Sequence, residues 1–533
     1  MNSAGVVLTG GPIYTMDGAA AEAVRVDGDR ISVVGSLEGA MEPGRAEVVD
    51  LDGRCLLPGF VDAHTHPLML GQCMTWADLS TASSVDEVVK ILREHSLGLK
   101  RTLPVRGFGY DHHRLSDDRH PTAADLDRVS EDVTVTIMHV SGHGYVANSH
   151  GLDAAGIRAD TPTPTGGLID RDGSGAPTGR VFDAACDLLT GPDGTKVGNH
   201  GPNLHIPDTH EALAAQLDTA QESLLAAGIT SVGDCQVTDR ELSAYANSRD
   251  AGRLRLRVTT YVLSSHIGLV DRYGLEVGFG DDHLNFGGIK HYADGSLVAG
   301  TACLPCGCGN THGFLYHEEG DLEDLIDESN ALGRQTATHA QGPEAIQLVL
   351  DALGRRAPHP DLRHRIEHCG FPTDGQIVEM RRLGVVPVPQ PAQVHLYGEG
   401  VRRDHPEHAE RMYASGLFAR AGLPVVLSSD TPVTSPDVML ACWCAETRLT
   451  SQGRIIGEAA KVTRSQALEG YTRGGAHALR RDDVGSIRVG NHADLVLLSA
   501  DPFTVSVDTL PSITVDETWV DGRPAWIALQ GLT

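Results

Sequence analysis

Short apolar runs alternate with amphipathic segments through the middle of the chain. The β-like runs lie at residues 134–140, 230–233, 256–262, 288–292, 336–339, 365–368, 385–388 and 425–428. Helical spacing of apolar residues marks residues 211–227, 321–332, 343–353, 374–383 and 417–421. Because strands that alternate with helices form parallel sheets, the pattern favours an α/β fold. We predict a (β/α)8 TIM-type barrel over residues 57–483.

Both ends of the chain carry a different pattern, in which short β-rich runs are separated by tight turns. At the start the runs are residues 6–8, 23–26 and 31–34, with Gly-Gly-Pro and Asp-Gly turns between them, which predicts a small antiparallel sheet. Similar runs occur at 485–490, 493–498 and 517–526. We therefore expect residues 1–56 and 484–533 to form one composite β-sandwich domain.

Residues 80–200 fit the strand–helix rhythm poorly. They contain stretches rich in Gly, Pro and Asp, such as Thr-Pro-Thr-Pro-Thr-Gly-Gly at 161–167, which are typical of loops and turns. We interpret this region as an insertion after the first barrel strand, a lid-like segment over the barrel mouth.

Composition and charge exclude some partners. The 533 residues include 43 basic and 71 acidic side chains, for a net charge of −28. Nucleic acids and anionic membranes select clustered Lys and Arg, so neither is an expected partner.

No apolar run is long enough for a transmembrane helix. The N-terminus lacks a signal-peptide pattern, and the ten Cys are scattered as free thiols would be, so we expect a cytoplasmic protein.

The segment at residues 57–66 reads Leu-Pro-Gly-Phe-Val-Asp-Ala-His-Thr-His. On a strand, His64 and His66 point to the same side, so two imidazoles converge from one short segment. Such a pair suits a metal ion. In a chain with 26 His, a chance pair is an equally good explanation. The residues at the ends of the later strands decide between the two.

Several later runs end in a residue with metal-ligand chemistry. They are His339, His368 and Asp430, and a further run carries Lys290. Singly, a strand-end His is more often a hydrogen-bonded structural residue, and a strand-end Asp more often caps a helix or a turn. In one barrel all of these residues would lie at the same mouth. The ordered set of His-x-His, Lys, His, His and Asp therefore indicates a metal centre.

Further motifs accompany this ordered set along most of the chain, and with them the chain resembles the amidohydrolase superfamily. The closest resemblance is to the amidohydrolase-3 branch, which includes N-substituted formamide deformylases and YtcJ-like proteins. The motifs are Arg-Gly-Phe-Gly-Tyr-Asp at 106–111, His-Pro-Thr-Ala-Ala-Asp-Leu-Asp at 120–127, Ser-Gly-His at 141–143, Asn-Ser at 148–149, Gly-Gly-Leu-Ile-Asp-Arg-Asp at 166–172, Pro-Thr-Gly at 177–179, Asp-Gly-Ser at 294–296 and Gly-Asn-His-Ala-Asp at 490–494.

The resemblance implies a ligand set. His64 and His66 would bind one metal together with Asp430, His339 and His368 would bind a second, and Lys290, carboxylated by CO₂, would bridge the two. Zinc is the expected metal, and Fe, Mn or Co suit the same ligands. The alternative for Lys290 is an ordinary ion pair with Asp294 or Glu318, which would leave a one-metal site.

The resemblance also implies a metal-dependent hydrolase that cleaves an amide-like C–N bond through an activated water. The expected substrate is a small N-acyl or N-formyl compound or a cyclic amide. Asp430 would accept a proton from the water and deliver one to the leaving nitrogen. His143 is the other catalytic candidate, as a hydrogen-bond donor to the substrate oxygen. Many relatives carry Asp where this chain has Ser141, so carboxylate support from that position is missing.

Candidate substrate-binding residues are Tyr110, Asp111, His395, Tyr397 and Cys306. Cys303, Cys306 and Cys308 occupy a stretch where the family usually has small residues and an Arg. Their spacing matches no standard zinc motif, so we interpret the stretch as an unusual substrate loop.

Two other functions remain open. The same metal centre could serve a non-hydrolytic cyclisation or isomerisation in a specialised pathway, or the scaffold could be a catalytically silent binding protein. Every metal-ligand position that the resemblance implies carries a suitable residue, which weighs against a catalytically silent protein. The expected partner is a small-molecule substrate, and relatives often dimerise, so a homodimer is a further expectation.

Overall fold

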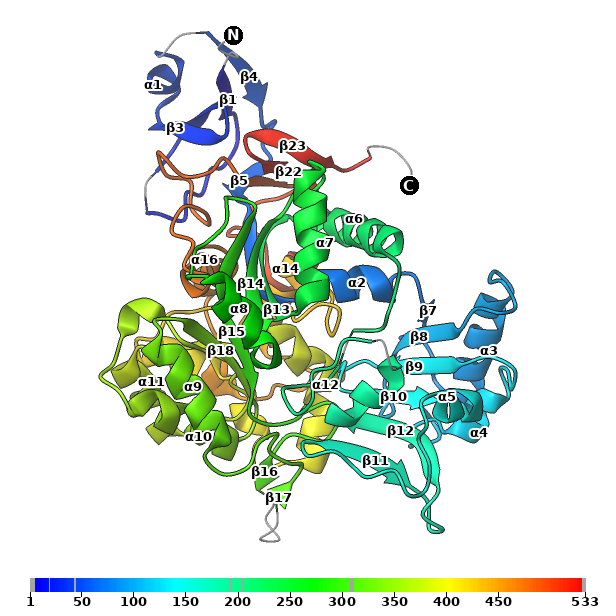
Figure 1. The fold of residues 1–533 in the computed structure, drawn as a ribbon. Helices are drawn as coiled ribbons and strands as arrows, with labels where there is room; N and C mark the ends of the chain where they lie inside the picture. Colours follow the sequence, from blue (N-terminus) through cyan, green and yellow to red (C-terminus); the bar gives the residue numbers. More distant parts are fainter. Residues whose placement is uncertain are drawn as a thin grey trace.

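A computed structural model describes residues 5–18, 20–42, 45–191, 194–203, 205–305 and 311–529. Its centre is a curved parallel sheet of seven strands surrounded by helices (Figure 1). The sheet confirms the predicted barrel. In spatial order the strands are β20 (Val386–Val388), β19 (Arg365–His368), β18 (Gln335–Ala340), β15 (Leu284–Tyr292), β14 (Arg257–Leu263), β13 (Ile229–Val237) and β6 (Phe60–Thr65).

Residues 424–430 occupy the position of the eighth strand without forming a regular one. The backbone N–H of Ser428 donates to the Pro389 carbonyl at 3.2 Å, beside β20, and that of Asp430 donates to the His64 carbonyl at 2.9 Å, beside β6. Asp430 has a φ of +61°, which takes the chain out of the extended conformation that a β ladder needs. The segment therefore closes the ring and presents Asp430 next to His64.

Helices cover the outside of the ring, and those predicted from helical spacing are present. The start and stop signals in the sequence explain their limits. For α11 (Asp374–Leu383), Thr373 and Gln376 form a capping box, and Gly384 ends the helix with a φ of +71°. The other main helices are α2 (Pro67–Cys73), α6 (His210–Ala226), α7 (Asp239–Asp250), α8 (Ile267–Tyr273), α9 (Asp321–Ala331), α10 (Pro343–Gly354), α12 (Pro391–Asp404), α13 (Ser415–Arg420) and α14 (Val438–Thr447).

The insertion is a folded unit with its own sheet, which lies to one side of the barrel (Figure 1). Its helices α3 (Val85–Ser96), α4 (Ala123–Asp127) and α5 (Ser149–Ala154) pack with the sheet over separate apolar cores. The sequence predicts the insertion but not this sheet. The run at 134–140, counted above among the barrel strands, is wrong as a barrel strand, because it forms β9 (Val135–His139) of the insertion. The strands in order are β11 (Gly167–Arg171), β12 (Pro177–Asp183), β10 (Gly144–Ala147), β9, β8 (Val105–Tyr110) and β7 (Ala77–Asp78).

The two ends of the chain contribute to one apolar core. One sheet has the order β3 (Arg30–Gly35), β2 (Ala23–Asp27), β1 (Gly5–Thr9) and β4 (Ala46–Asp50). The other has β23 (Arg523–Ile527), β22 (Val515–Val520), β21 (Leu495–Leu498) and β5 (Cys55–Pro58). Leu8, Val24, Leu56, Leu497 and Trp519 pack between them. The first sheet is not purely antiparallel as predicted, because β4 pairs with β1 in parallel.

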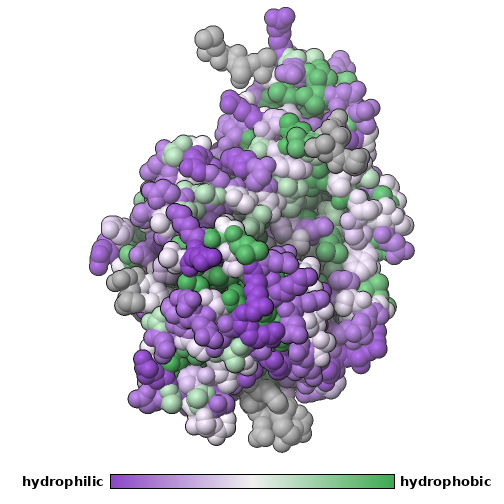
Figure 2. Space-filling model, turned by 90° about the vertical axis from the view of Figure 1, so that its right-hand side faces the viewer, coloured by the Kyte–Doolittle hydropathy of each residue, from purple (hydrophilic) through white to green (hydrophobic). Residues whose placement is uncertain are grey.

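The molecular surface is mostly hydrophilic on the face that Figure 2 shows. Hydrophilic residues dominate the face in Figure 2, and the hydrophobic residues there form separate patches. Within the ranges that the structure describes, no helix has the length and apolar character needed to cross a lipid bilayer.

A partly buried charge network joins the barrel to the C-terminal sheet. The guanidinium of Arg257, on β14, contacts both carboxylate oxygens of Asp494 at 2.6 and 2.9 Å and one oxygen of Asp521 at 2.5 Å. Nε2 of His283 lies 2.8 Å from the other oxygen of Asp521. The hydrogen bond to Asp521 raises the pKa of His283 above its ordinary value.

This network predicts a pH-dependent contribution to stability. The folded-state pKa of His283 is raised, so its contribution is complete below the unfolded pKa of about 6.5 and is lost as the pH rises through the folded value. The free energy of unfolding of the wild type minus that of His283→Gln should therefore be largest in mild acid and shrink in alkali. Urea unfolding of both proteins at a series of pH values measures this difference in the free energy of unfolding. The same difference is measured for His359→Gln, at an exposed position. The prediction is contradicted if the difference for His283→Gln changes with pH no more than the difference for His359→Gln.

Candidate metal centre

Three buried side chains meet where the first barrel strand ends. The last residues of β6 are fully buried, and the two-residue period of the strand turns His64 and the following His66 toward Asp430. Nε2 of His64 lies 3.5 Å from Oδ1 of Asp430, and Nε2 of His66 lies 3.2 Å from the same oxygen. The ligand atoms of all three residues lie within 4.8 Å of one another, so together they could hold a metal ion.

Glu367 orients the first of these histidines. Its Oε2 lies 2.5 Å from Nδ1 of His64, and its two oxygens lie 2.7 and 2.8 Å from the guanidinium of Arg365. All three side chains are buried. A carboxylate on one ring nitrogen holds the proton there and leaves Nε2 free to bind a metal. The sequence analysis missed Glu367, although it directly precedes His368 in the strand.

His339 and His368, at the ends of β18 and β19, stand beside this group. Their ring centroids are 4.5 Å apart, and that of His368 is 4.9 Å from His64. Nε2 of His339 lies 3.0 Å from the Gly295 carbonyl, and Nδ1 of His368 lies 2.8 Å from Oε1 of Gln390. In each ring one nitrogen is engaged by an acceptor, which leaves the other directed elsewhere.

Lys290, on β15, is fully buried beneath these rings. Its Nζ lies 4.7 Å from the centre of the Tyr292 ring and has no hydrogen-bond partner among the described residues. Burial lowers the pKa of its ammonium group. The ion pair with Asp294 is not formed, because the Asp294 carboxylate accepts from the backbone N–H groups of Gln341, Gly342 and Cys303 at 2.9–3.0 Å. Glu318 lines a different cavity, beside Lys196 and Asn199.

Some buried polar atoms among these residues have no hydrogen bond, and they indicate whether the residues suit a metal. Lys290 Nζ, His66 Nδ1 and His339 Nδ1 are buried without a hydrogen bond in the described part of the chain. A buried polar atom without a partner costs on the order of 1–3 kcal/mol. Nitrogen and carboxylate donors at the mouth of one barrel are ligands that zinc and related divalent ions accept. The residues therefore fit a metal centre.

The electrostatics of three of the four histidines support the same use. Burial lowers the pKa of His64 and of His339 well below the ordinary value, and lowers that of His368 to about 3. These rings are neutral at physiological pH, as metal ligands must be. Burial also opposes protonation of His66, but the carboxylates of Asp234 and Asp430 outweigh it and raise its pKa to about 9.

His143 reaches the centre from the insertion. Its ring centroid lies 5.3 Å from that of His339. Its Nδ1 lies 2.6 Å from Oδ1 of Asp183, which also accepts from the hydroxyl of Tyr316 at 2.6 Å. The carboxylate support that Ser141 cannot provide therefore comes from Asp183, which the sequence analysis did not identify. Its place at the end of β12 gave no sign of this contact.

The five substrate-binding candidates lie in different places. Asp111 lines a cavity next to the metal-centre residues, and so does Tyr397, whose hydroxyl donates to the Val433 carbonyl at 2.9 Å. Tyr110 is buried with its hydroxyl 3.1 Å from Nδ1 of His120, and Nδ1 of His395 lies 2.9 Å from the Leu449 carbonyl. Cys306, like Cys308, lies outside the described residues.

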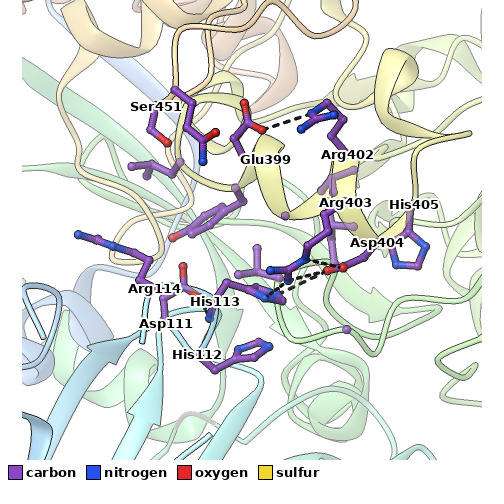
Figure 3. A pocket seen from close by; sticks show the side chains of 18 residues that line it. Asp111, His112, His113, Arg114, Glu399, Arg402, Arg403, Asp404, His405 and Ser451 are labelled. Carbon is purple, nitrogen blue, oxygen red and sulfur yellow. Dashed lines mark hydrogen bonds and ion pairs between the residues drawn. The ribbon is translucent and has the colours of Figure 1, made fainter. Parts of the chain in front are cut away.

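Two cavities share Asp111, Arg114, Leu396 and Tyr397 in their walls. The first, of about 690 Å³, has a charged wall formed by α12, which includes Glu399, Arg403 and Asp404 (Figure 3). The second, of about 540 Å³, borders residues 431–436, directly after Asp430. Its wall is mainly apolar and includes Leu70, Trp76, Phe108, Val140, Leu396 and Val433.

Comparisons with known proteins agree with this geometry. A model described as the amidohydrolase family matches residues 47–525. The chain is 31% identical to an N-substituted formamide deformylase of Arthrobacter pascens, over 94% of each chain, and 29% identical to the putative amidohydrolase YtcJ of Bacillus subtilis, over 96% of this chain and 98% of YtcJ. An uncharacterized metal-dependent hydrolase of Pyrococcus horikoshii OT3 has a TM-score of 0.76 at 25% identity, with 95% of this chain and 99% of that one covered.

Proposed function

The chain belongs to the amidohydrolase family, and from this premise we propose that it hydrolyses an amide-like C–N bond in a small N-acyl, N-formyl or cyclic amide compound. One observation carries the proposal. His64, His66 and Asp430 converge at the mouth of the barrel, beside buried nitrogen atoms of Lys290 and His339 that have no hydrogen-bond partner among the residues that the structure describes.

The proposed ligands divide into two groups. His64, His66 and Asp430 would hold one divalent ion, and His339 and His368 a second. Lys290 would bridge them as a carbamate, because an anion between two cations lowers their repulsion. Zinc is the metal we propose, with Fe, Mn and Co as alternatives for the same donors. When bound, the ions would lower the pKa of a water molecule toward about 7 and polarise a substrate carbonyl.

Asp430 is placed to move the proton of that water. Its Oδ1 faces His64 and His66, and its Oδ2 accepts from Nε2 of Gln393 at 3.1 Å. This contact holds the carboxylate beside the segment 431–436 that borders the second cavity. We propose that Asp430 accepts the water proton and then donates it to the leaving nitrogen.

His143 is placed to bind the oxygen of the substrate carbonyl. Asp183 contacts Nδ1 of its ring, so Nε2 is the atom left to face a ligand, and it donates a hydrogen bond when the ring carries both of its protons. A hydrogen-bond donor at the oxygen where charge develops stabilises the transition state. The Tyr316 hydroxyl donates to the same oxygen of Asp183 at 2.6 Å and helps to hold that carboxylate in place.

The apolar cavity supports a choice of substrate. It adjoins the segment after Asp430 and is walled by Trp76, Phe108 and Val433. A hydrocarbon group on the amide nitrogen would remove this wall from water when it binds. N-alkyl and N-arylalkyl formamides and acylamides are therefore the first substrates to test, in agreement with the name of the Arthrobacter relative.

Three measurements test the proposed reaction. Purified enzyme is incubated with N-substituted formamides, N-acyl amino acids and cyclic ureides, and the released amine or acid is quantified. Activity should disappear after treatment with a chelator and return when a divalent ion is added. Turnover that persists in the metal-free protein would refute the metal-dependent mechanism. A product of unchanged mass would instead indicate isomerisation, and loss of water from the substrate would indicate cyclisation.

Leu396 offers a test of the apolar cavity. It lies in the walls of both cavities and is 41% exposed. Leu396→Asp should raise KM for an N-benzyl or N-alkyl substrate by about tenfold, because roughly 1.4 kcal/mol of apolar contact is lost. The KM of unsubstituted formamide should change little. Leu332→Asp, at an exposed position at the end of α9, is the matched control. An equal rise for both substrates would contradict this placement.

A further inference from the structure

A buried carboxylate on the wall shared by the two cavities has no role in the proposed reaction. Asp111 follows β8 in the insertion, borders both cavities and is 8% exposed. Its Oδ1 accepts from the backbone N–H of His113 at 3.0 Å, and Asp111 forms no other hydrogen bond and no ion pair with a residue that the structure describes. Oδ2 is therefore left without a partner at the wall that the two cavities share.

The other buried carboxylates in the described ranges are better satisfied than Asp111. Each of them has at least two polar contacts within the protein. Asp294 accepts from three backbone N–H groups, for example, and Asp183 contacts both His143 and Tyr316. A carboxylate taken out of water is costly unless a counter-charge or several hydrogen bonds replace the water. The single contact of Asp111 therefore indicates a position that a ligand completes.

The nearby arginines leave Asp111 unpaired. Arg403 is held by Asp404, with contacts of 2.8 and 3.1 Å, and also contacts His113. Arg114 is exposed, so water screens its charge, and its guanidinium points away from Arg403 (Figure 3). The dashed lines in Figure 3 join Arg403 to Asp404, and none reaches Asp111. The cation that pairs with Asp111 must therefore come from outside the described part of the chain.

Asp111 also lies within electrostatic range of the metal-centre residues. Burial raises the pKa of the Tyr397 hydroxyl above its ordinary value, and the charges of Asp111 and Asp430 raise it further. Both carboxylates therefore act on one side chain, Tyr397, which lines the two cavities. The second cavity covers the same interval, since its wall includes both Asp111 and the segment directly after Asp430. A ligand that fills this cavity would extend from the reacting amide to Asp111.

The chemistry along this interval selects the ligand. Leu396 and Val433 make its wall apolar, and Asp111 adds a buried anion. An alkyl chain suits such a wall, and an aliphatic ammonium group, which is protonated at neutral pH, forms charge-assisted hydrogen bonds with a carboxylate. The net charge of −28 attracts cations toward the molecule.

We propose that Asp111 binds a protonated amine at the far end of the substrate, so that the enzyme acts on mono-acylated diamines. The methylene chain would lie along the apolar wall of the second cavity, with the amide at the metal centre and the ammonium group at Asp111. Hydrolysis of the amide by one water molecule would release a carboxylic acid and the free diamine. This inference rests on the proposed function, because it names the substrate class of the same site.

A comparison of substrates tests the inference in the wild type alone. N-(ω-aminoalkyl)formamides with chains of three to six carbons are compared with formamides of equal length that end in a methyl or a hydroxyl group. The kcat/KM of the best aminoalkyl compound should exceed that of both counterparts by at least about tenfold, as a hydrogen bond to a charged group allows. Equal values for the three end groups, or a preference for N-formyl amino acids, which end in a carboxylate, would overturn the inference.

Asp111→Asn assigns this preference to a residue. Asn keeps the acceptor for the His113 N–H, so the turn is retained while the charge is lost. The ratio of kcat/KM for aminoalkyl to alkyl substrates should fall at least about tenfold in this variant. Asp50→Asn is the matched control, since Asp50 is exposed and accepts from the backbone N–H of Asp52 at 2.9 Å in the same kind of turn. The control should keep the wild-type ratio.

A binding measurement distinguishes failure of this inference from failure of the proposed function. Calorimetric titration with a five-carbon diamine, the expected product, requires no turnover. Its Kd should rise at least about tenfold in Asp111→Asn and stay at the wild-type value in Asp50→Asn. If the wild type binds the diamine through Asp111 but hydrolyses none of the formamides, the proposed function fails and the amine site stands. Hydrolysis of alkylformamides with unchanged diamine affinity in Asp111→Asn would overturn the amine site and leave the proposed function in place.

Discussion

Replacing Asp430 with Asn is expected to lower kcat by a factor of about 10²–10⁴, the usual contribution of a positioned general acid–base group. The amide cannot take a proton from water or return one to the leaving nitrogen. The substitution isolates that chemistry, because Asp430 has a φ of +61° and Asn is among the few residues that tolerate the left-handed region. The amide oxygen can still face His64 and His66, so metal content should fall little.

Both kcat and metal content are measured for Asp430→Asn and for the control Asp437→Asn. Asp437 lies in the same stretch and caps α14 through the backbone N–H of Leu440 at 2.9 Å, a task that Asn performs equally well. This control should retain wild-type activity. If Asp430→Asn keeps its metal and more than about a tenth of its activity, below the smallest effect expected of a general base, Asp430 is not the proton carrier.

The barrel could be predicted because its strands are short apolar runs whose ends carry the chemistry. β19 covers residues 365–368, as predicted, and its last residue is His368. The eighth run was predicted as a strand on the same grounds, but residues 425–428 form no regular strand, and the chain enters the left-handed region beyond them, at Asp430. Hydrophobic pattern reports burial, and it does not report the backbone angle at which a functional residue is held.

The supporting contacts of the site could not be predicted in this way. Glu367 and His64 are 303 residues apart in the chain, and Asp183 reaches His143 from another strand of the insertion. A carboxylate that orients a histidine has no fixed spacing from it, because only the folded chain brings the two together.

Glu367→Gln is expected to reduce both stability and metal affinity strongly, through two separable effects. The carboxylate of Glu367 is the partner of the fully buried Arg365. Removing one member of a buried ion pair leaves an uncompensated charge, at a cost of about 3–5 kcal/mol in the free energy of unfolding. The same change weakens the hold on Nδ1 of His64, and loss of such an orienting group typically reduces metal affinity about 10–100-fold.

A double variant separates the two effects. Arg365→Met together with Glu367→Gln removes the stranded cation, so most of the lost stability should return, whereas the metal affinity should stay low because His64 still lacks its carboxylate. Chemical unfolding of the metal-free proteins and competition with a chelator measure the two quantities. Glu379→Gln, which breaks the partly exposed pair with Arg382, should change stability by no more than about 1 kcal/mol. Recovery of metal affinity in the double variant would mean that Glu367 serves Arg365 alone and that another contact orients His64.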